Sequence, residues 1–275
     1  MSKDIRVCII EDDPYSRDLM TMLLARDWRT RVVAELGTAQ EVDEYLSQDQ
    51  LKADIVILDT EMPGDLQWSF RIIDALRSIP DSPAILCTDT QVDIKLLKIF
   101  SAGNIETYLL KSEILYSLGS AVSQIISGRT LATPSIWKAA QDRGLVFSSN
   151  VTVVDGAKPV ANFTAREKEI VRLGILFNLA HRDVADELII SPIWVSEIIS
   201  NIYEKLGMRE IVSGEYAVSD YFEDAYVAER INDILKRSRN KNKNKKLRKT
   251  PWVSTLAFHM LTIPDNDLIH IRELG

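Results

Sequence analysis

The sequence predicts an α/β fold, a doubly wound five-stranded parallel sheet, followed by an all-α helix-turn-helix domain. Five short apolar runs alternate with five helical patterns over roughly 130 residues, which is typical of a doubly wound sheet. Four of these runs end on chemically reactive side chains. Further along, a leading helix precedes a short helix, a tight turn and a third helix.

The strands are runs of apolar, often β-branched residues, as expected where both faces of a parallel sheet are buried. They are predicted at residues 5–10, 31–36, 55–58, 84–88 and 107–110. Helical spacing of apolar residues predicts helices at residues 14–25, 38–48, 66–78, 92–102 and 113–126. Pro14 suits a first helical position, Thr38 and Glu41 form a capping box, and Gly103 and Gly128 end helices.

Composition sets limits on the kind of protein. The 275 residues suffice for two ordinary domains, and 46% hydrophobic with 27% charged residues is typical of a globular chain. No apolar run approaches the roughly 18 residues of a membrane span, and the N-terminus has no signal-peptide pattern. We therefore expect a cytoplasmic protein without a membrane partner. Cys8 and Cys87 fall in predicted strands and are expected to be core residues, not a disulfide.

Reactive side chains stand where the predicted strands end, and such strand ends meet at one edge of a parallel sheet. They are Glu11 and Asp12, Asp59, Thr88, and Lys111. Converging carboxylates repel each other unless a cation lies among them, and their hard oxygens suit Mg²⁺. A lysine and a hydroxyl can bind phosphoryl oxygens, while an aspartate can act as a nucleophile. The pattern indicates phosphoryl chemistry with Asp59 as acceptor.

Residues 3–127 resemble the flavodoxin-like receiver domain of bacterial response regulators. The resemblance implies that Asp59, followed by Met-Pro-Gly, is the phospho-acceptor. It implies Mg²⁺ ligands at Glu11, Asp12, Asp59 and the backbone carbonyl of Glu61. It also implies switch and phosphoryl-binding roles for Thr88, Lys111 and Tyr108. Asp13 is then an outlying third acid, and Tyr108 has a second interpretation as a plain strand tyrosine.

Two positions differ from the receiver pattern. Asp89 stands after the predicted switch hydroxyl, where the family usually has a small residue. Glu61 lies two residues past the acceptor, where family members vary. Added negative charge beside the site disfavours an incoming phosphoryl donor. We expect slow phosphorylation by small-molecule donors.

Residues 129–162 are predicted to be a linker, a tether with local structure. Thr133-Pro134 starts a short helix through Ala140, and residues 151–154 are a possible short strand. In the second domain, residues 163–236, Thr164 and Glu167 form a capping box. A helix follows at residues 181–188, and Ser191-Pro192 starts another that ends at Gly207.

Residues 163–208 resemble the helix-turn-helix of the LuxR/NarL/FixJ family, with an opening Phe-Thr-Ala-Arg-Glu at 163–167. The resemblance implies phosphorylation-controlled DNA binding as a homodimer, with the helix from Pro192 in the major groove. The DNA-binding candidates are Ser191, Trp194, Val195, Ser196, Ile198, Asn201 and Lys205.

The predicted groove face departs from that family. Members usually present Thr-Val-Lys-x-His, whereas residues 194–198 read Trp-Val-Ser-Glu-Ile. Residues 163–210 hold six basic and eight acidic side chains, so this module should bind DNA weakly by itself. Trp194, Ile198 and Asn201 share one helical face. That stripe indicates either a protein partner or burial against other segments of the chain.

Three features come after the module. A helix at residues 219–236 carries an apolar seam, Phe222, Ala225, Ile231 and Leu235, for dimerisation or for packing on its own module. Residues 236–249 hold nine basic side chains and no acid. This segment, assigned as a basic linker at residues 237–250, is either a solvated tether or a segment that attracts phosphate groups. Residues 251–275 form an extension whose role the sequence leaves unassigned.

Two functional hypotheses result. In the first, a sensor histidine kinase phosphorylates Asp59 and the helix-turn-helix controls transcription. In the second, the receiver controls a protein-interaction module that no longer reads DNA specifically. An enzymatic output is not expected, since no catalytic constellation follows Lys111.

Overall fold

The computed structural model describes residues 4–47, 51–62, 66–157, 160–213, 217–220, 222, 225–241 and 251–262. The chain divides into two compact units, residues 1–157 and residues 158–275, called unit 1 and unit 2 below. No helix in the described ranges is both long enough and apolar enough to cross a membrane.

Unit 1 is built on a parallel sheet in the order β2-β1-β3-β4-β5-β6-β7. Its strands are β1 Ile5–Ile10, β2 Thr30–Leu36, β3 Ile55–Asp59, β4 Ala84–Asp89, β5 Thr107–Leu110, β6 Thr130–Ala132 and β7 Val151–Val153. Its helices are α1 Pro14–Arg26, α2 Ala39–Leu46, α3 Leu66–Arg77, α4 Ile94–Ser101, α5 Lys111–Ile114, α6 Leu118–Ile126 and α7 Pro134–Gln141. The predicted doubly wound fold is confirmed.

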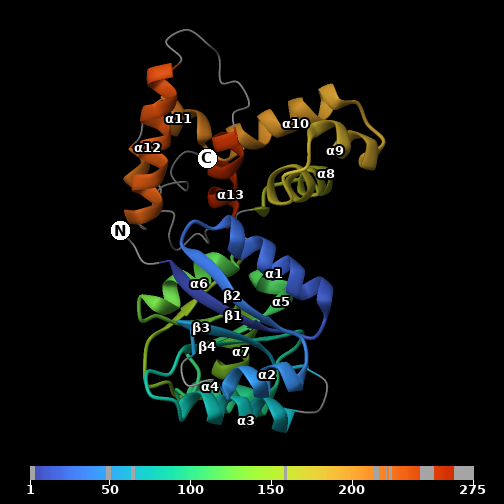
Figure 1. Ribbon diagram of the computed structural model, residues 1–275. Helices are drawn as coiled ribbons and strands as arrows, with labels where there is room; N and C mark the ends of the chain where they lie inside the picture. The colour runs from blue at the N-terminus through green and yellow to red at the C-terminus, as the bar shows by residue number, and fades with distance from the viewer. Residues whose placement is uncertain are drawn as a thin grey trace. The chain divides into compact units, whose positions relative to one another are not determined.

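Helices cover both faces of this sheet, with α1 and α6 on one side and α2, α3, α4 and α7 on the other (Figure 1). Alternate side chains of β1 belong to two separate cores. Val7 and Ile9 pack with one helical layer, and Cys8 and Ile10 with the other. Both cysteines are buried and free, as expected from the sequence.

The predicted linker is the main difference from the expected fold of unit 1. Residues 130–132 pair with β5 as β6, and residues 151–153 pair with β6 as β7. Leu131, Ala132 and Ile136 are fully buried. The boundary expected at residue 128 therefore moves to residue 157, because this segment supplies backbone partners to the edge of β5.

The last predicted helix, residues 113–126, is interrupted. Leu115 has a φ of 44°, outside the helical region, so α5 ends at Ile114 and α6 begins at Leu118. The amide of Ser117 donates to the carbonyl of Ile114 across this break. Lys111 therefore stands at the start of a one-turn helix directly after β5.

The described residues of unit 2 form helices only, as predicted. Its elements are α8 Ala165–Ile170, η2 Val171–Leu176, α9 His181–Leu188, α10 Pro192–Lys205, α11 Met208–Ser213, η3 Val218–Asp220, α12 Ala225–Lys241 and α13 Pro251–Thr262. The capping box of Thr164 and Glu167 starts α8. The leading helix continues as a π-helix, η2, in which the Phe177 amide donates to the Arg172 carbonyl.

Gly174 lies in η2 at the contact with α10. A Cβ at this position would lie 3.1 Å from Cδ1 of Ile199. On α10, Val195, Ile199 and Ile202 are buried at successive turns. The core of the helix-turn-helix is therefore formed by η2, α9 and the inner face of α10.

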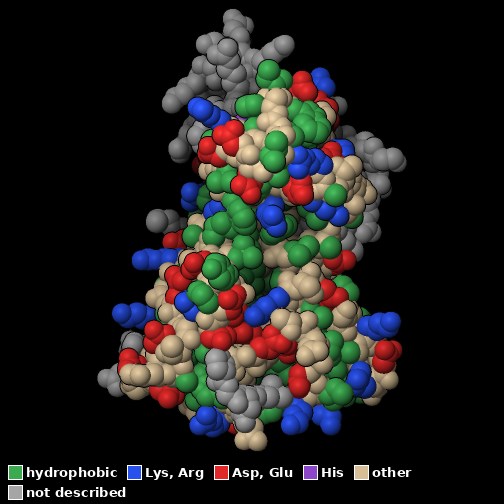
Figure 2. Space-filling view, turned by 90° about the vertical axis from the view of Figure 1, so that its right-hand side faces the viewer, with side chains coloured by type: hydrophobic (Ala, Val, Ile, Leu, Met, Phe, Trp, Pro, Cys, Tyr) green, Lys and Arg blue, Asp and Glu red, His purple; other side chains and the backbone are tan. Residues whose placement is uncertain are grey.

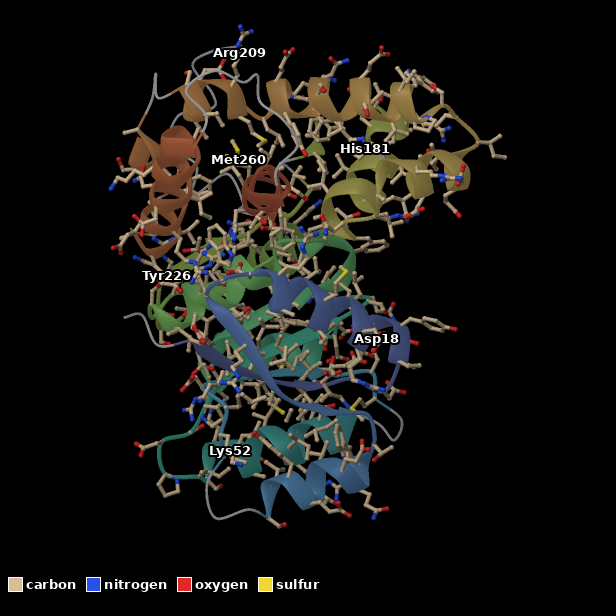
Figure 3. The ribbon with its side chains drawn as sticks, turned by 45° about the horizontal axis from the view of Figure 1, so that its top comes forward. Asp18, Lys52, His181, Arg209, Tyr226 and Met260 are labelled. Atoms are coloured by element: carbon tan, nitrogen blue, oxygen red, sulfur yellow. The ribbon has the colours of Figure 1, made fainter. Side chains whose placement is uncertain are left out.

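Two later helices complete unit 2. Phe222, Ile231 and Leu235 of the predicted seam are buried, which favours packing over dimerisation for these residues, whereas Ala225 is exposed. α13 packs against η2, and the Ser254 hydroxyl donates to Oδ1 of Asn178 at 3.0 Å. Met260 on α13 is fully buried, among the side chains of unit 2 in Figure 3. The first part of the unassigned extension is thus a structural element of unit 2.

Candidate functional site

The carboxyl edge of the sheet gathers the strand-end residues predicted from the sequence. Parallel register places Asp59, the last residue of β3, opposite Thr88 of β4. Glu11 follows β1 directly, and Lys111 follows β5. In open α/β sheets this edge is where ligands bind.

Three carboxylates converge at this edge. One oxygen each from Glu11, Asp12 and Asp59 lies within 4.8 Å of the other two. Glu11 and Asp59 are almost completely buried, and Asp12 is half-buried. Three hard oxygen donors from three side chains are suited to Mg²⁺ or a similar divalent cation.

Lys111 is the cation that faces this cluster. Its Nζ lies 2.8 Å from Oε2 of Glu11 and 3.1 Å from Oδ1 of Asp59. Burial by itself lowers the pKa of Lys111, but the hydrogen bond to Glu11 and the charges of both carboxylates raise it overall. The ammonium therefore stays charged at neutral pH.

Glu11 shows that one ammonium does not neutralise the cluster. Burial raises the pKa of Glu11 to about 7, the hydrogen bond to Lys111 opposes the rise, and the negative charge of Asp59 adds to it. Among the described residues the two buried carboxylates of Glu11 and Asp59 thus pair with the same ammonium, and the half-buried Asp12 lies beside them. This excess of negative charge fits a site for a divalent cation.

Thr88 is fully buried beside the cluster. Among the described residues its Oγ1 has no hydrogen-bond partner. A small hollow of about 80 Å³, bordered by Ser16, Leu19, Leu115 and Lys111 among others, reaches this residue. The hydroxyl is therefore free to donate to an oxygen placed at the edge.

Tyr108 belongs to a buried network rather than standing alone on its strand. Its hydroxyl lies 3.1 Å from Oδ2 of Asp89 and accepts from the amide of Asp93 at 2.8 Å. The Thr60 hydroxyl also donates to Oδ2 of Asp89, at 3.1 Å. Burial raises the pKa of Asp89 despite the hydrogen bond from the Gln91 amide.

This network links the loop after Asp59 to the start of α4. Asp93 caps that helix, since its carboxylate accepts from the amides of Lys95 and Leu96. Neither Thr60 nor Asp93 is predicted by the sequence analysis. Asp93 has a sequence signal, an acid three residues before the helical apolar pattern, whereas Thr60 has none beyond following the acceptor.

The remaining acids near the edge have local roles. Asp13 caps α1, because its side chain accepts from the Ser16 amide at 2.8 Å, and hydrogen bonding to the Ser16 side chain and then to its amide lowers the pKa of Asp13. Glu61 is exposed and its carboxylate accepts from the Thr90 hydroxyl.

The predicted DNA-binding residues are not all on the surface. Val195 is fully buried, so its prediction as a DNA contact is wrong: it faces the core of unit 2. Ser191 caps α10 by accepting from the Trp194 amide. Lys205 donates to both carboxylate oxygens of Glu167, at 2.7 and 2.9 Å. Its charge is therefore balanced within the unit.

The other candidates lie on or near the surface. Oγ of Ser196 is 2.9 Å from Nδ1 of His181, the first residue of α9. Ile198 is half-buried, whereas Trp194 and Asn201 are exposed. The predicted stripe is thus only partly covered. Ile189 and Ile193, which no sequence motif singles out, are among the most exposed large hydrophobic residues described.

Comparisons with known proteins agree with this site. A family model for the response regulator receiver domain matches residues 7–122. Fimbriae Z protein of Salmonella typhimurium is 25% identical over 210 residues, covering 76% of this chain and 94% of that protein. The DNA-binding transcriptional activator DevR/DosR of Mycobacterium tuberculosis is 25% identical over 208 residues, covering 74% of this chain and 89% of that protein.

A solved LuxR-family response regulator from Aurantimonas sp. SI85-9A1 is 29% identical and covers 52% of this chain and 99% of that chain, with a TM-score of 0.42. The family match covers the sheet edge that holds the carboxylates, and the curated relatives extend over both units. Residues 7–122 thus match the receiver domain of response regulators, and over both units the chain is similar to regulators of this kind.

Proposed function

We propose that Asp59 is the phospho-acceptor of this response regulator and that a sensor histidine kinase is the donor. The observation that carries this proposal is the convergence of three carboxylates and Lys111 at the end of β3. Glu11, Asp12, Asp59 and the backbone carbonyl of Glu61 are the proposed ligands of Mg²⁺. When bound, Mg²⁺ supplies positive charge for the phosphoryl oxygens of the donor.

The chain's own residues then have distinct roles in the transfer. An oxygen of Asp59 attacks phosphorus, the P–N bond of the donor phosphohistidine breaks, and the imidazole leaves. Lys111, which already contacts Asp59, moves its charge-assisted hydrogen bond to a phosphoryl oxygen. Thr88 donates its unused hydroxyl hydrogen to another.

The proposed output is control of transcription by a homodimer that binds DNA through α9 and α10. The domain order and the curated relatives support it. The nine basic side chains at residues 236–249 would supply phosphate attraction that the acidic helix pair lacks.

Phosphorylation is tested by incubating the full chain with acetyl phosphate and Mg²⁺ and measuring intact mass. Wild type should gain one phosphoryl group that is lost under alkaline hydroxylamine, and Asp59→Asn should gain none. Asp18→Asn on the exposed side of α1 (Figure 3) is the matched control and should react like wild type. Modification of Asp59→Asn would contradict the assignment.

A second function is supported by the surface of α10. Trp194 is exposed, Lys205 is paired with Glu167, and Val195 is buried, so few candidates remain for base or phosphate contacts. In this alternative, unit 2 binds a protein and the receiver controls that contact. Titration with random duplex DNA at low salt separates the two functions: absence of binding would exclude the transcriptional output.

A further inference from the structure

The turn between α9 and α10 carries an apolar surface that DNA recognition does not explain. Ile189, Ile193 and Trp194 are 91%, 73% and 45% exposed. We name these three residues the apolar turn surface. Five of the ten large hydrophobic side chains exposed in the described residues fall between residues 177 and 194. Exposed apolar side chains that gather on a surface are typical of an interaction site.

Ile189 adds an independent observation. It is the C-cap of α9 with φ 54° and ψ 51°, a left-handed conformation. A β-branched residue is strained there, and glycine or asparagine would serve the turn better. Its side chain contributes little to the core, because it is almost entirely exposed. The side chain therefore costs stability without adding packing, which points to a use outside the fold.

The charges around this surface limit what can bind. Residues 181–205, which span α9 and α10, contain two basic and five acidic side chains. Asp186 lies one turn before Ile189, and Glu197 lies one turn after Ile193; both acids are exposed. Figure 2 shows hydrophobic side chains with both acidic and basic side chains around them on the face of unit 2 that it presents.

Two of the nearby cations are already engaged, whereas Arg182, on α9 one turn before Asp186, is exposed. Arg166 lies over the Trp194 ring at 6.0 Å, and its guanidinium also pairs with Glu169 at 2.8 Å. Lys205 pairs with Glu167. The acidic side chains near the apolar turn surface therefore repel a DNA backbone. They also repel a second copy of the same face, since self-pairing would set like charges against each other.

We propose that the apolar turn surface binds a basic amphipathic helical segment of a partner protein. Apolar side chains of that segment would cover Ile189, Ile193 and Trp194, and its Lys or Arg side chains would face Asp186 and Glu197. The inference deepens the proposed interaction role of unit 2 and is independent of the chemistry at Asp59. Paired apolar and charged contacts of this kind are the usual basis of helix docking.

The test uses the full chain and two labelled synthetic helical peptides that share one leucine face. One carries lysine on its polar face, the other glutamate. Fluorescence anisotropy should show binding of the lysine peptide, weakened by salt, and at least tenfold weaker binding of the glutamate peptide. Ile193→Ser should weaken binding of the lysine peptide at least fivefold. Ile94 is an exposed isoleucine on α4, so Ile94→Ser is the matched control and should leave the affinity for the lysine peptide unchanged.

Ile189→Gly separates binding from folding. It removes the exposed side chain and also the strain at positive φ, so its thermal midpoint should equal or exceed that of wild type. Its affinity for the lysine peptide should nevertheless fall. Glu197→Lys should reduce the preference for the lysine peptide over the glutamate peptide.

Several outcomes would overturn the inference. They are equal binding of both peptides, unchanged affinity in Ile189→Gly, a DNA complex abolished by Ile193→Ser, or self-association abolished by the same substitution. The last two would assign the surface to DNA or to a second copy. Failure of acetyl phosphate to modify Asp59 would instead contradict the receiver proposal, and the peptide result would stand by itself.

Discussion

At the scale of single residues, Glu11 is the group whose charge state the site must control. Burial beside Asp59 raises its pKa to about 7, although Lys111 opposes the rise. The carboxyl is therefore partly protonated near neutral pH in the metal-free protein. A cation that binds Glu11 must displace this proton.

This gives a pH prediction with a defined sign. The ordinary pKa of Glu11 is 4.5 and its folded value is about 7. The protonated group favours the folded state below 4.5, and that contribution is lost as pH rises through 7. Metal-free protein should lose thermal stability between pH 5 and 8, and Mg²⁺ should restore it most at pH 8. Melting curves with and without Mg²⁺ measure this, and Glu11→Gln should flatten the pH dependence.

Asp89 provides the second residue-scale prediction. Its buried carboxylate adds negative charge beside the proposed acceptor, and this charge should slow an anionic donor. Asp89→Asn removes the charge and keeps an oxygen for Tyr108 and Thr60. Its rate with acetyl phosphate should rise several-fold, as should that of Asp89→Ala, while the exposed Asp74→Asn should react like wild type. Equal rates in all four proteins would contradict this role.

Site residues could be predicted best where they end parallel strands, because the fold brings those strand ends together in space. Parallel strands brought Glu11, Asp59 and Lys111 together as expected from their places at strand ends. Prediction from the sequence worked less well for Val195, whose buried orientation depends on how α10 packs. It could not supply the Asp89–Tyr108 hydrogen bond, because that contact depends on where two buried side chains point and not on which residues end the strands.

At the scale of elements, the start of α4 is the segment most directly tied to the proposed acceptor. The amide of Asp93 donates to Tyr108, and Tyr108 contacts Asp89. The start of α4 is thus held by a hydrogen bond to a strand residue, Tyr108, as well as by its own N-cap. Movement of the loop after Asp59 can reach α4 through Thr60 and Asp89.

Removal of the Tyr108 hydroxyl tests this link. In Tyr108→Phe, amide hydrogen exchange at Asp93 and at the first turn of α4 should be roughly five- to tenfold faster, corresponding to one hydrogen bond of about 1 kcal/mol. The capped start of α2 should keep its exchange rate. Tyr15→Phe, a tyrosine exposed on α1, is the control. Unchanged exchange at Asp93 in Tyr108→Phe would exclude the link.

The strand β6 shows why element prediction stopped short, whereas β7 lies within the possible short strand predicted at residues 151–154. Each has three residues, too few for apolar periodicity to distinguish a strand from a loop. They form because β5 offers an unpaired edge, which is a tertiary cause. The break at Leu115 is likewise set by backbone geometry and has no glycine or proline to announce it.

Truncation tests the contribution of this segment. A fragment of residues 1–128 lacks Leu131, Ala132 and Ile136, all fully buried, and exposes the edge of β5. It should aggregate or unfold at a clearly lower urea concentration than a fragment of residues 1–157. Loss of each large buried side chain costs roughly 2–5 kcal/mol. Equal urea midpoints for the two fragments would show that residues 129–157 do not stabilise the sheet and act only as a tether.

At the scale of the whole molecule, charge is distributed unevenly. The chain has a net charge of −7, yet residues 236–249 alone hold nine of its 33 basic side chains. Replacing those nine by serine should abolish binding to random duplex DNA at low salt if the segment supplies the phosphate contacts. Electrophoretic titration over a salt series measures this. Persistence of binding in that variant, together with its loss in a variant of α10, would assign the contacts to the helix instead.

The π-helix η2 has a consequence for aligning this protein with its relatives. One turn with i to i+5 bonding accommodates an extra residue in the leading helix, as the Phe177-to-Arg172 hydrogen bond shows. Each extra residue rotates all later positions of the helix by about 100° relative to a regular helix. An alignment that counts regular turns from Phe163 would therefore assign inward and outward positions out of phase. Removing one residue of η2 should restore regular i to i+4 bonding there and leave the later buried side chains on their present faces.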